Sequence, residues 1–287
     1  MVSTLRTRDG RALTYAQHGD LDGRPVIVMH GTPGSRIGPL PRASRLYPQG
    51  IRLIAYDRPG YGGSDRLPGR AVVHAAADTA DLADSLGIER FAVVGRSGGA
   101  PHALACAALL PERVTRVAAL VPPAPYSLMG PSWYDGMAAS NVREYTTAEA
   151  GPAALEEYLG ALAKEIRADP ESHLPFDEKD LVRPDRAVMA DFGIRGMLLD
   201  NFREALRQTP YGWVDDSLSF VRPWGFDPAA IRLPVRLWHG TDDVYAPVTH
   251  TRWLASHIPG AQIEIREATG HFGAIEALPS ILSWLSA

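Results

Sequence analysis

The chain contains 287 residues, 45% of them hydrophobic, and carries a formal net charge of −4 at pH 7. This length suits one large α/β domain, or a core with an inserted subdomain, with ample apolar sequence for a sizeable core. The slightly acidic balance argues against nucleic acid or an anionic membrane surface as a partner. The one cysteine, Cys106, excludes an internal disulfide bond and a metal site built from cysteines. It lies in an apolar stretch, so we expect it to be buried.

Residues 1–8 contain no apolar segment of the kind that a secretory signal needs. No run of about 18 apolar residues predicts a membrane span. We therefore expect a cytoplasmic protein, a monomer or homodimer, that acts on a small molecule without a membrane partner.

The first half of the chain alternates strand and helix patterns. Leu5 to Gln17 is expected to form a hairpin that turns at Asp9-Gly10. A helix fits Ala71 to Leu86, where Ala and Leu recur at helical spacing. Continuous apolar runs typical of buried parallel strands lie at Pro25–Met29, Ile51–Tyr56, Phe91–Val94 and Val114–Val121. This alternation predicts a parallel sheet with helices on both faces.

The strand pattern disappears from about Tyr126 to Pro223 and then resumes. Helical stretches are expected in the gap, near Ala148–Ala168, Asp177–Phe192 and Gly193–Gln208. Beyond it the sequence predicts strands at Leu233–Trp238 and Ala261–Arg266, and helices at Val248–His257 and Leu278–Leu285. Because strands resume, we interpret residues 124–229 as a helical cap (lid) inserted into a core of residues 1–123 and 230–287. Ordinary surface helices are the alternative.

The pentapeptide Gly95-Arg96-Ser97-Gly98-Gly99 reads G-x-S-x-G between an apolar strand and an apolar helix. A tight strand-to-helix turn of this kind leaves Ser97 at its apex, and its small residues permit the close approach. Five residues with two free positions occur by chance, and a capping serine is the alternative. The strand before and the helix after favour a nucleophile.

A serine hydroxyl needs an adjacent base, and that base needs an orienting acid. Thr241-Asp242-Asp243 and His271 each follow a later predicted strand. Active groups of parallel sheets gather at the carboxyl ends of the strands, where Ser97 also lies. The order Ser…Asp…His is the one found in α/β hydrolases.

At these residues the chain resembles the α/β-hydrolase family, over nearly its whole length outside the cap. The segments that carry the resemblance are His30–Gly34, Asp57–Ser64, Gly95–Gly99, His239–Pro247 and Gly270-His271. The resemblance implies an α/β-hydrolase fold with a mostly parallel, eight-stranded sheet flanked by helices. It implies a serine hydrolase that needs no cofactor and no metal.

The resemblance also implies roles for individual residues. The family's acid stands three residues after the glycine, which is Asp243, so Asp242 is expected to be a solvated or turn-capping carboxylate. His271 becomes the base. The backbone N–H groups of Thr32 and Gly98 become the oxyanion hole. We expect structural roles for the other histidines near these loops, which are His30, His239 and His102.

Arg96 departs from the family's common forms, in which bulky neutral residues or His are frequent. Its guanidinium could bind a substrate carboxylate or pair with an acid such as Asp57. We favour the ion pair because a buried arginine needs a partner. The identity of the nucleophile argues against two enzyme classes of this fold, since dehalogenases and epoxide hydrolases carry Asp in place of Ser97.

These features predict a hydrolase of carboxylic esters or lactones of small to medium size. Cap residues that could line its pocket are Tyr134, Tyr145, Tyr158, Met189, Phe192, Met197 and Phe202. A proline-iminopeptidase-like enzyme is the alternative, with a substrate amine held by cap acids among Glu149, Glu156, Glu157, Glu165, Asp191 and Asp200. A non-hydrolytic cyclase or receptor with an intact triad is a third hypothesis.

Overall fold

The computed structural model describes residues 2–287, so Met1 of the expected core lies outside the described residues. In these residues one eight-stranded sheet has the order β1-β2-β4-β3-β5-β6-β7-β8. Its strands are β1 (Val2–Arg6), β2 (Ala12–Gly19), β3 (Arg24–Met29), β4 (Ile51–Tyr56), β5 (Phe91–Arg96), β6 (Val114–Leu120), β7 (Val235–Gly240) and β8 (Gln262–Arg266). Only β2 runs antiparallel to its neighbours, β1 and β4. The predicted mostly parallel sheet and the hairpin at Asp9-Gly10 are confirmed.

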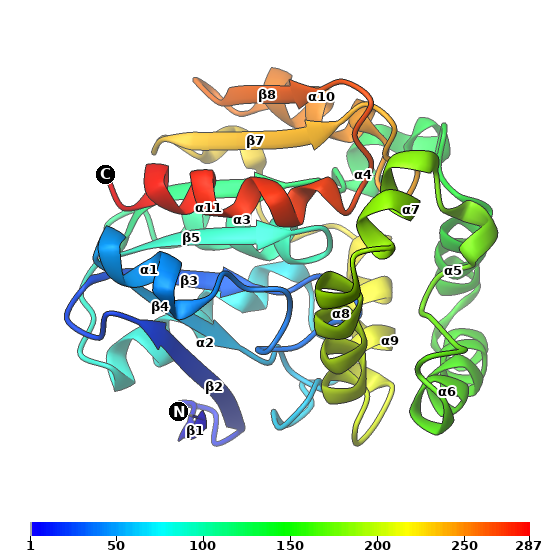
Figure 1. Cartoon of the computed structure of the whole chain (residues 1–287), viewed down its shortest axis with the longest axis horizontal. Helices are drawn as coiled ribbons and strands as arrows, with labels where there is room; N and C mark the ends of the chain where they lie inside the picture. The colour runs from blue at the N-terminus through cyan, green and yellow to red at the C-terminus, as the bar shows by residue number, and fades with distance from the viewer. Residues whose placement is uncertain (1) are drawn as a thin grey trace.

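The central strands are apolar on both faces because helices cover both. Along β5, Val93 packs toward α3 (Gly99–Leu109), whereas Val94 packs toward α11 (Gly273–Leu285). Figure 1 shows α11 crossing in front of the sheet. The period of two along each strand therefore builds two apolar layers, one on each side. The remaining core helices are α1 (Ala43–Leu46), α2 (Ala75–Ser85) and α10 (Val248–His257), with 3₁₀ turns at Tyr47–Gln49 and Val72–His74. A further 3₁₀ turn, Pro228–Ala230, precedes β7.

Six α-helices lie between β6 and β7, and we call residues 124–229 the insertion. They are α4 (Tyr126–Met129), α5 (Ala139–Ala150), α6 (Pro152–Ala168), α7 (Arg183–Met189), α8 (Phe192–Ala205) and α9 (Tyr211–Phe220), with 3₁₀ turns at Gly130–Tyr134 and Glu178–Asp180. Figure 1 shows α5 to α9 beyond the carboxyl ends of the parallel strands. The division of the chain into a core and a cap at these boundaries stays a prediction.

Most of α5 and all of α9 were not expected from the sequence. Residues 212–220 of α9 are all buried, although four of them are Asp or Ser. A polar helix that is buried on all sides shows no amphipathic period, so the sequence pattern could not reveal it. In the described residues no helix is long and apolar enough to cross a membrane.

Asp216 in α9 joins the insertion to the core through buried charges. Its carboxylate lies 2.5 Å from Arg58 Nη2 and 2.6 Å from Arg70 Nη1, and it accepts a hydrogen bond from the Tyr61 hydroxyl. Burial by itself would raise the pKa of Asp216, but the two guanidinium groups hold it well below its usual range. The insertion is therefore anchored over the sheet by ionised groups that are almost completely buried.

Candidate active site

Ser97 lies between the end of β5 and the start of α3 with φ at +54°. Its N–H donates to Leu120 O at 2.8 Å, and its carbonyl accepts from Ala100 N at 2.8 Å. L-residues adopt this left-handed conformation at an energetic cost, which is a common feature of functional turns. The N-cap of α3 is Gly98, and no side chain caps the helix, so the alternative of a capping serine is wrong.

Glycines on either side of Ser97 permit the tight turn. A Cβ on Gly95 would lie 2.3 Å from Gly99 O, and a Cβ on Gly99 would lie 2.2 Å from Met29 O. Both atoms belong to the backbone and could not move aside. The small residues of the pentapeptide are thus required by the close approach of α3 to β5 and β3.

Asp243 and His271 meet in the loops that follow β7 and β8. His271 Nδ1 lies 2.7 Å from Asp243 Oδ2, while Asp243 Oδ1 accepts the N–H groups of Tyr245 (2.8 Å) and Ala246 (3.0 Å). Burial would raise the pKa of Asp243, but His271 and His239 hold it well below its usual range. An ionised carboxylate can only accept, so Nδ1 of His271 carries a proton and Nε2 is left to accept one.

His239 is buried on the far side of Asp243. Its Nε2 lies 2.6 Å from Ala246 O and 3.2 Å from Asp243 Oδ2, and its Nδ1 lies 2.6 Å from the Thr251 hydroxyl. The ring therefore positions the carboxylate that contacts His271. Asp242 is exposed and accepts the Thr241 hydroxyl, so Asp243 and not Asp242 contacts His271.

The loop after β3 brings Thr32 against Gly98. A Cβ on Gly98 would lie 2.2 Å from Thr32 Oγ1, so the two residues are in close contact. The Thr32 hydroxyl donates to Asp216 at 2.5 Å and accepts from Arg58 at 3.1 Å, which fixes the loop. In residues 2–287 neither backbone N–H, of Thr32 or of Gly98, has an acceptor within the protein.

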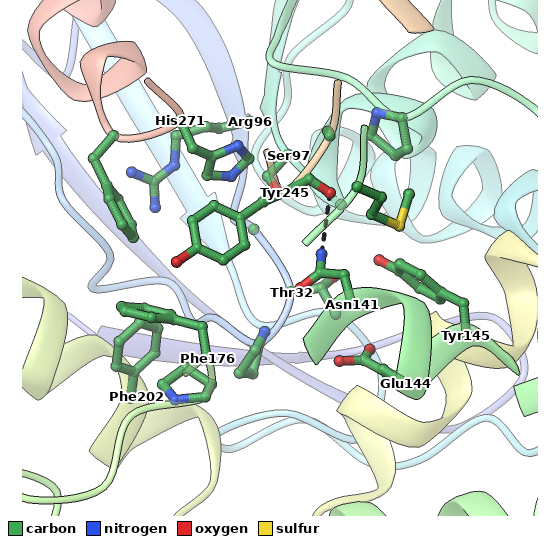
Figure 2. A pocket seen from close by; sticks show the side chains of 18 of the residues that line it. Thr32, Arg96, Ser97, Asn141, Glu144, Tyr145, Phe176, Phe202, Tyr245 and His271 are labelled. Carbon is green, nitrogen blue, oxygen red and sulfur yellow. Dashed lines mark hydrogen bonds between the residues drawn. The ribbon is translucent and has the colours of Figure 1, made fainter. Parts of the chain in front are cut away.

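A cavity lies between the strand ends and the insertion. The core contributes Gly31, Thr32, Pro33, Arg96, Ser97, Gly98, Pro123, Tyr245, Ala246, His271 and Phe272; the insertion contributes Trp133, Met137, Asn141, Glu144, Tyr145, Pro175, Phe176, Leu198 and Phe202. Figure 2 shows Ser97, His271 and Arg96 toward one end, and Glu144 and Tyr145 toward the other. The arrangement places a hydroxyl, an imidazole and two free N–H groups around one space, as acyl transfer requires.

Comparison with known proteins shows the family. The chain matches the family described as "alpha/beta hydrolase fold" over residues 24–278. The chain belongs to the α/β-hydrolase family. It is an enzyme of the hydrolase class, and its relatives and structural neighbours are hydrolases and a peroxidase of this fold.

The matches to individual relatives span different shares of this chain. The 2-hydroxymuconate semialdehyde hydrolase of Pseudomonas putida is 29% identical over 274 residues, which covers 90% of this chain and 84% of that protein. A proline iminopeptidase of Xylella fastidiosa (strain 9a5c) is 35% identical over 113 residues, 38% of this chain and 36% of that protein. The chain thus spans about a third of the length of that peptidase.

Among solved structures, the enol-lactonase of Burkholderia xenovorans LB400 superposes with a TM-score of 0.62 at 20% identity, covering 98% of this chain and 97% of that chain. An α/β-hydrolase fold protein of Nakamurella multipartita gives a TM-score of 0.69 at 23% identity, covering 100% and 99%. These likenesses show a shared fold.

Three insertion residues expected at the pocket lie elsewhere in this hydrolase. Tyr134 packs edge-on against Tyr126 and Trp133, and Met189 lies in the apolar core of the insertion. Phe192 is 92% exposed. These predictions are wrong because composition does not fix the rotation of a helix about its axis. Of the other residues named from the sequence, Tyr145 and Phe202 line the pocket, and Tyr158 and Met197 do not.

Two polar pocket residues, Asn141 and Glu144, escaped the sequence interpretation because they belong to the unexpected α5. Asn141 Nδ2 donates to Tyr245 O at 3.1 Å, the contact dashed in Figure 2. Glu144 accepts Trp213 Nε1 at 3.0 Å and the Ser217 hydroxyl at 2.5 Å. Burial raises the pKa of Glu144 to about 7. The one available signal was helical spacing, which brings Asn141, Glu144 and Tyr145 to a single face.

The favoured ion pair of Arg96 is wrong. Asp57 is fully buried and pairs with Arg36, at 2.5 Å from Nη1, through the loop after β3. That carboxylate also accepts the Arg36 and Gly63 N–H groups. Its acceptor sites are thus occupied from the loops around it, and Arg96 lines the pocket beside Ser97 instead.

Proposed function

We propose that this hydrolase cleaves a carboxylic ester or lactone of small to medium size through an acyl-enzyme. In this proposal Ser97 is the nucleophile, His271 is the base, and the ionised carboxylate of Asp243 orients His271. The observation that carries the proposal is the His271–Asp243 hydrogen bond of 2.7 Å beside a strained serine in one pocket. The pocket is lined by side chains of both the core and the insertion, so a substrate bound there would lie between them.

The proposed cycle has two balanced halves. Ser97 Oγ attacks the carbonyl carbon as His271 Nε2 takes the hydroxyl proton, and Asp243 remains ionised. The tetrahedral intermediate collapses, the C–O bond to the leaving alcohol breaks, and His271 returns the proton to that alcohol. Water then attacks the acyl-enzyme with His271 again as base, which releases the acid and restores Ser97.

The oxyanion of each tetrahedral intermediate would accept the N–H groups of Thr32 and Gly98. These donors have no other acceptor among residues 2–287, and Gly98 stands at the N-terminus of α3. The helix dipole there favours negative charge. Loss of one such donor typically lowers the rate by ~10²–10³.

A proline-iminopeptidase-like activity is a second candidate because of Glu144. Its carboxylate lines the cavity, where it could hold a substrate's free amine, and the partial match to the Xylella fastidiosa protein is to such a peptidase. None of the six acids named from the sequence lines the cavity. The non-hydrolytic cyclase or receptor has no observation of its own.

Two assays test the proposal. We expect a fluorophosphonate probe to label Ser97, and p-nitrophenyl acetate to be turned over faster than proline p-nitroanilide. Ser97→Ala should abolish labelling and turnover, with folding checked by circular dichroism. Turnover of the anilide alone would favour the peptidase. Ligand binding without any labelling would favour the non-hydrolytic alternative.

A further inference from the structure

Arg96 is half-buried and, unlike the most deeply buried arginines of this fold, has no acid among the described residues close enough to compensate its charge. The three most buried ones each face a carboxylate: Arg36 faces Asp57 and Glu204, and Arg58 and Arg70 share Asp216. In residues 2–287, Arg96 makes no ion pair, and its side chain donates no hydrogen bond. The fold therefore supplies partners for its structural guanidinium groups and leaves one without.

Arg96 lines the cavity that holds Ser97. It directly precedes Ser97 in the chain, and Figure 2 shows its guanidinium on the side of His271. Glu144 is the one carboxylate among the residues that line this cavity, and Figure 2 places it toward the opposite end. Arg96 also borders a narrower cavity on the α11 side, whose described lining residues include no acid.

The desolvation of the Arg96 guanidinium costs free energy unless a ligand supplies an opposite charge. Burial, with no compensating acid, lowers the pKa of Arg96 to about 10. The group thus stays charged near neutral pH while it has lost part of its hydration. A guanidinium presents a planar fork of donors that matches a carboxylate with two parallel hydrogen bonds. A ligand carboxylate would supply the negative charge and the hydrogen-bond acceptors that no described residue of the fold provides to Arg96.

We propose that Arg96 binds a free carboxylate on the acyl part of the substrate, so that this hydrolase acts on esters or lactones of dicarboxylic acids. The acyl part is assigned because it stays bonded to Ser97, the neighbour of Arg96, through the acyl-enzyme. The product is then a dicarboxylate. This inference rests on the proposed function for its kinetics, but it also predicts binding that requires no catalysis.

The kinetic test compares monomethyl esters of succinic, glutaric, adipic and suberic acid with the matching dimethyl esters, by methanol release. For at least one chain length we expect a higher kcat/KM for the monoester. Arg96→Gln should lower that monoester's kcat/KM roughly 10- to 100-fold, the range for a lost charge-assisted pair, and change the diester's by less than about threefold. Arg96→Lys should restore part of the loss.

Arg143→Gln is the matched control. Arg143 is exposed in α5 outside the cavity and stacks on Tyr158, so this change removes the same charge at a distance. It should leave the preference for the monoester unchanged. An equal loss on both esters in Arg96→Gln, or a wild-type preference for every diester, would overturn the proposal.

The binding test separates this inference from the proposed function. Ser97→Ala is titrated calorimetrically with glutarate and adipate, alone and with Arg96→Gln. We expect binding that the second change weakens at least tenfold. If neither dicarboxylate binds, or if Arg96→Gln does not change the affinity, the carboxylate site is overturned even if esters are hydrolysed. If binding depends on Arg96 but the wild-type protein is not labelled by the fluorophosphonate, the carboxylate site is supported and the hydrolytic function is rejected.

Discussion

At the scale of single residues, four groups hold the carboxylate of Asp243 in place. The rings of His271 and His239 contact Oδ2, and the N–H groups of Tyr245 and Ala246 donate to Oδ1. Each favours the ionised form, which in turn keeps the proton of His271 on Nδ1. The neighbouring Asp242 lies outside this arrangement because its side chain is exposed.

Asp243→Asn should therefore lower kcat by about 10³–10⁴ with little change in fold, since an amide can stabilise the wrong imidazole tautomer. Asp242→Asn, the matched control, should stay within about threefold of wild type. Ester hydrolysis and circular dichroism of both variants test this. A greater loss at Asp242 would mean that the wrong acid is assigned.

Glu144 supplies a prediction about stability. Burial raises its pKa to about 7 against the opposing hydrogen bonds of Ser217 and Trp213, from an ordinary value of 4.5. The folded state therefore holds a proton that the unfolded state has already released between these pH values. Wild type should lose stability relative to Glu144→Gln as pH rises from about 4.5 to about 7, by up to about 3 kcal/mol, and the difference should stay constant above.

Urea unfolding of both proteins at pH 5 and pH 8 measures the difference. The glutamine variant keeps a carbonyl acceptor for Trp213 and Ser217, so its shape and hydrogen bonds are matched. A stability difference that is the same at both pH values would contradict the raised pKa.

At the scale of elements, α7 of the insertion holds the loop that carries His271. Asp185 of α7 is fully buried and accepts the N–H of His271 at 3.1 Å and of Phe272 at 2.8 Å, at the start of α11. A Cβ on Gly270 would lie 2.4 Å from the Asp185 carboxyl carbon, so the glycine is required by this contact. The insertion thus contacts the loop of the proposed base as well as covering the pocket.

Asp185→Ala should lower kcat by about 10- to 100-fold, since small displacements of a reacting group cost rate steeply. Asp185→Asn retains one acceptor and should lose less. Asp191→Asn is the control, because Asp191 is exposed and caps α8 through the Ile194 N–H. Steady-state kinetics on an ester separate kcat from KM; an unchanged kcat in Asp185→Ala would show that the contact is structural only.

At the scale of the whole molecule, the buried charges of Asp216 join α9 to three separate core segments. The carboxylate of Asp216 contacts Thr32 after β3, Arg58 and Tyr61 after β4, and Arg70 before α2. Removing one member of such a network leaves the others charged and buried without a partner. The same carboxylate fixes Thr32, so the position of the insertion and the shape of the proposed oxyanion hole depend on each other.

Asp216→Asn should accordingly lower the free energy of unfolding by about 3–5 kcal/mol. Asp200→Asn, which breaks an exposed contact with Arg203, should change it by less than about 1 kcal/mol. Urea denaturation measures both. A small effect at Asp216 would mean that water or rearrangement compensates the two guanidinium groups.

The sequence by itself determined the fold class and the residues that stand at strand ends. Apolar runs, glycine turns and the pentapeptide around Ser97 are local features, and short stretches of chain decide them. The rule that parallel strands end at one edge placed the loops of Ser97, Asp242-Asp243 and His271 together, and the resemblance to the α/β-hydrolase family then singled out Asp243 and His271.

Only the tertiary structure decided which side chains face the pocket. Glu144 and Asn141 line it, whereas Phe192 faces solvent, because helix rotation depends on packing between segments far apart in the sequence. The partner of Arg96 was likewise beyond the sequence. Asp57 pairs with Arg36, and in residues 2–287 the guanidinium of Arg96 lies in the pocket beside Ser97 without an ion pair.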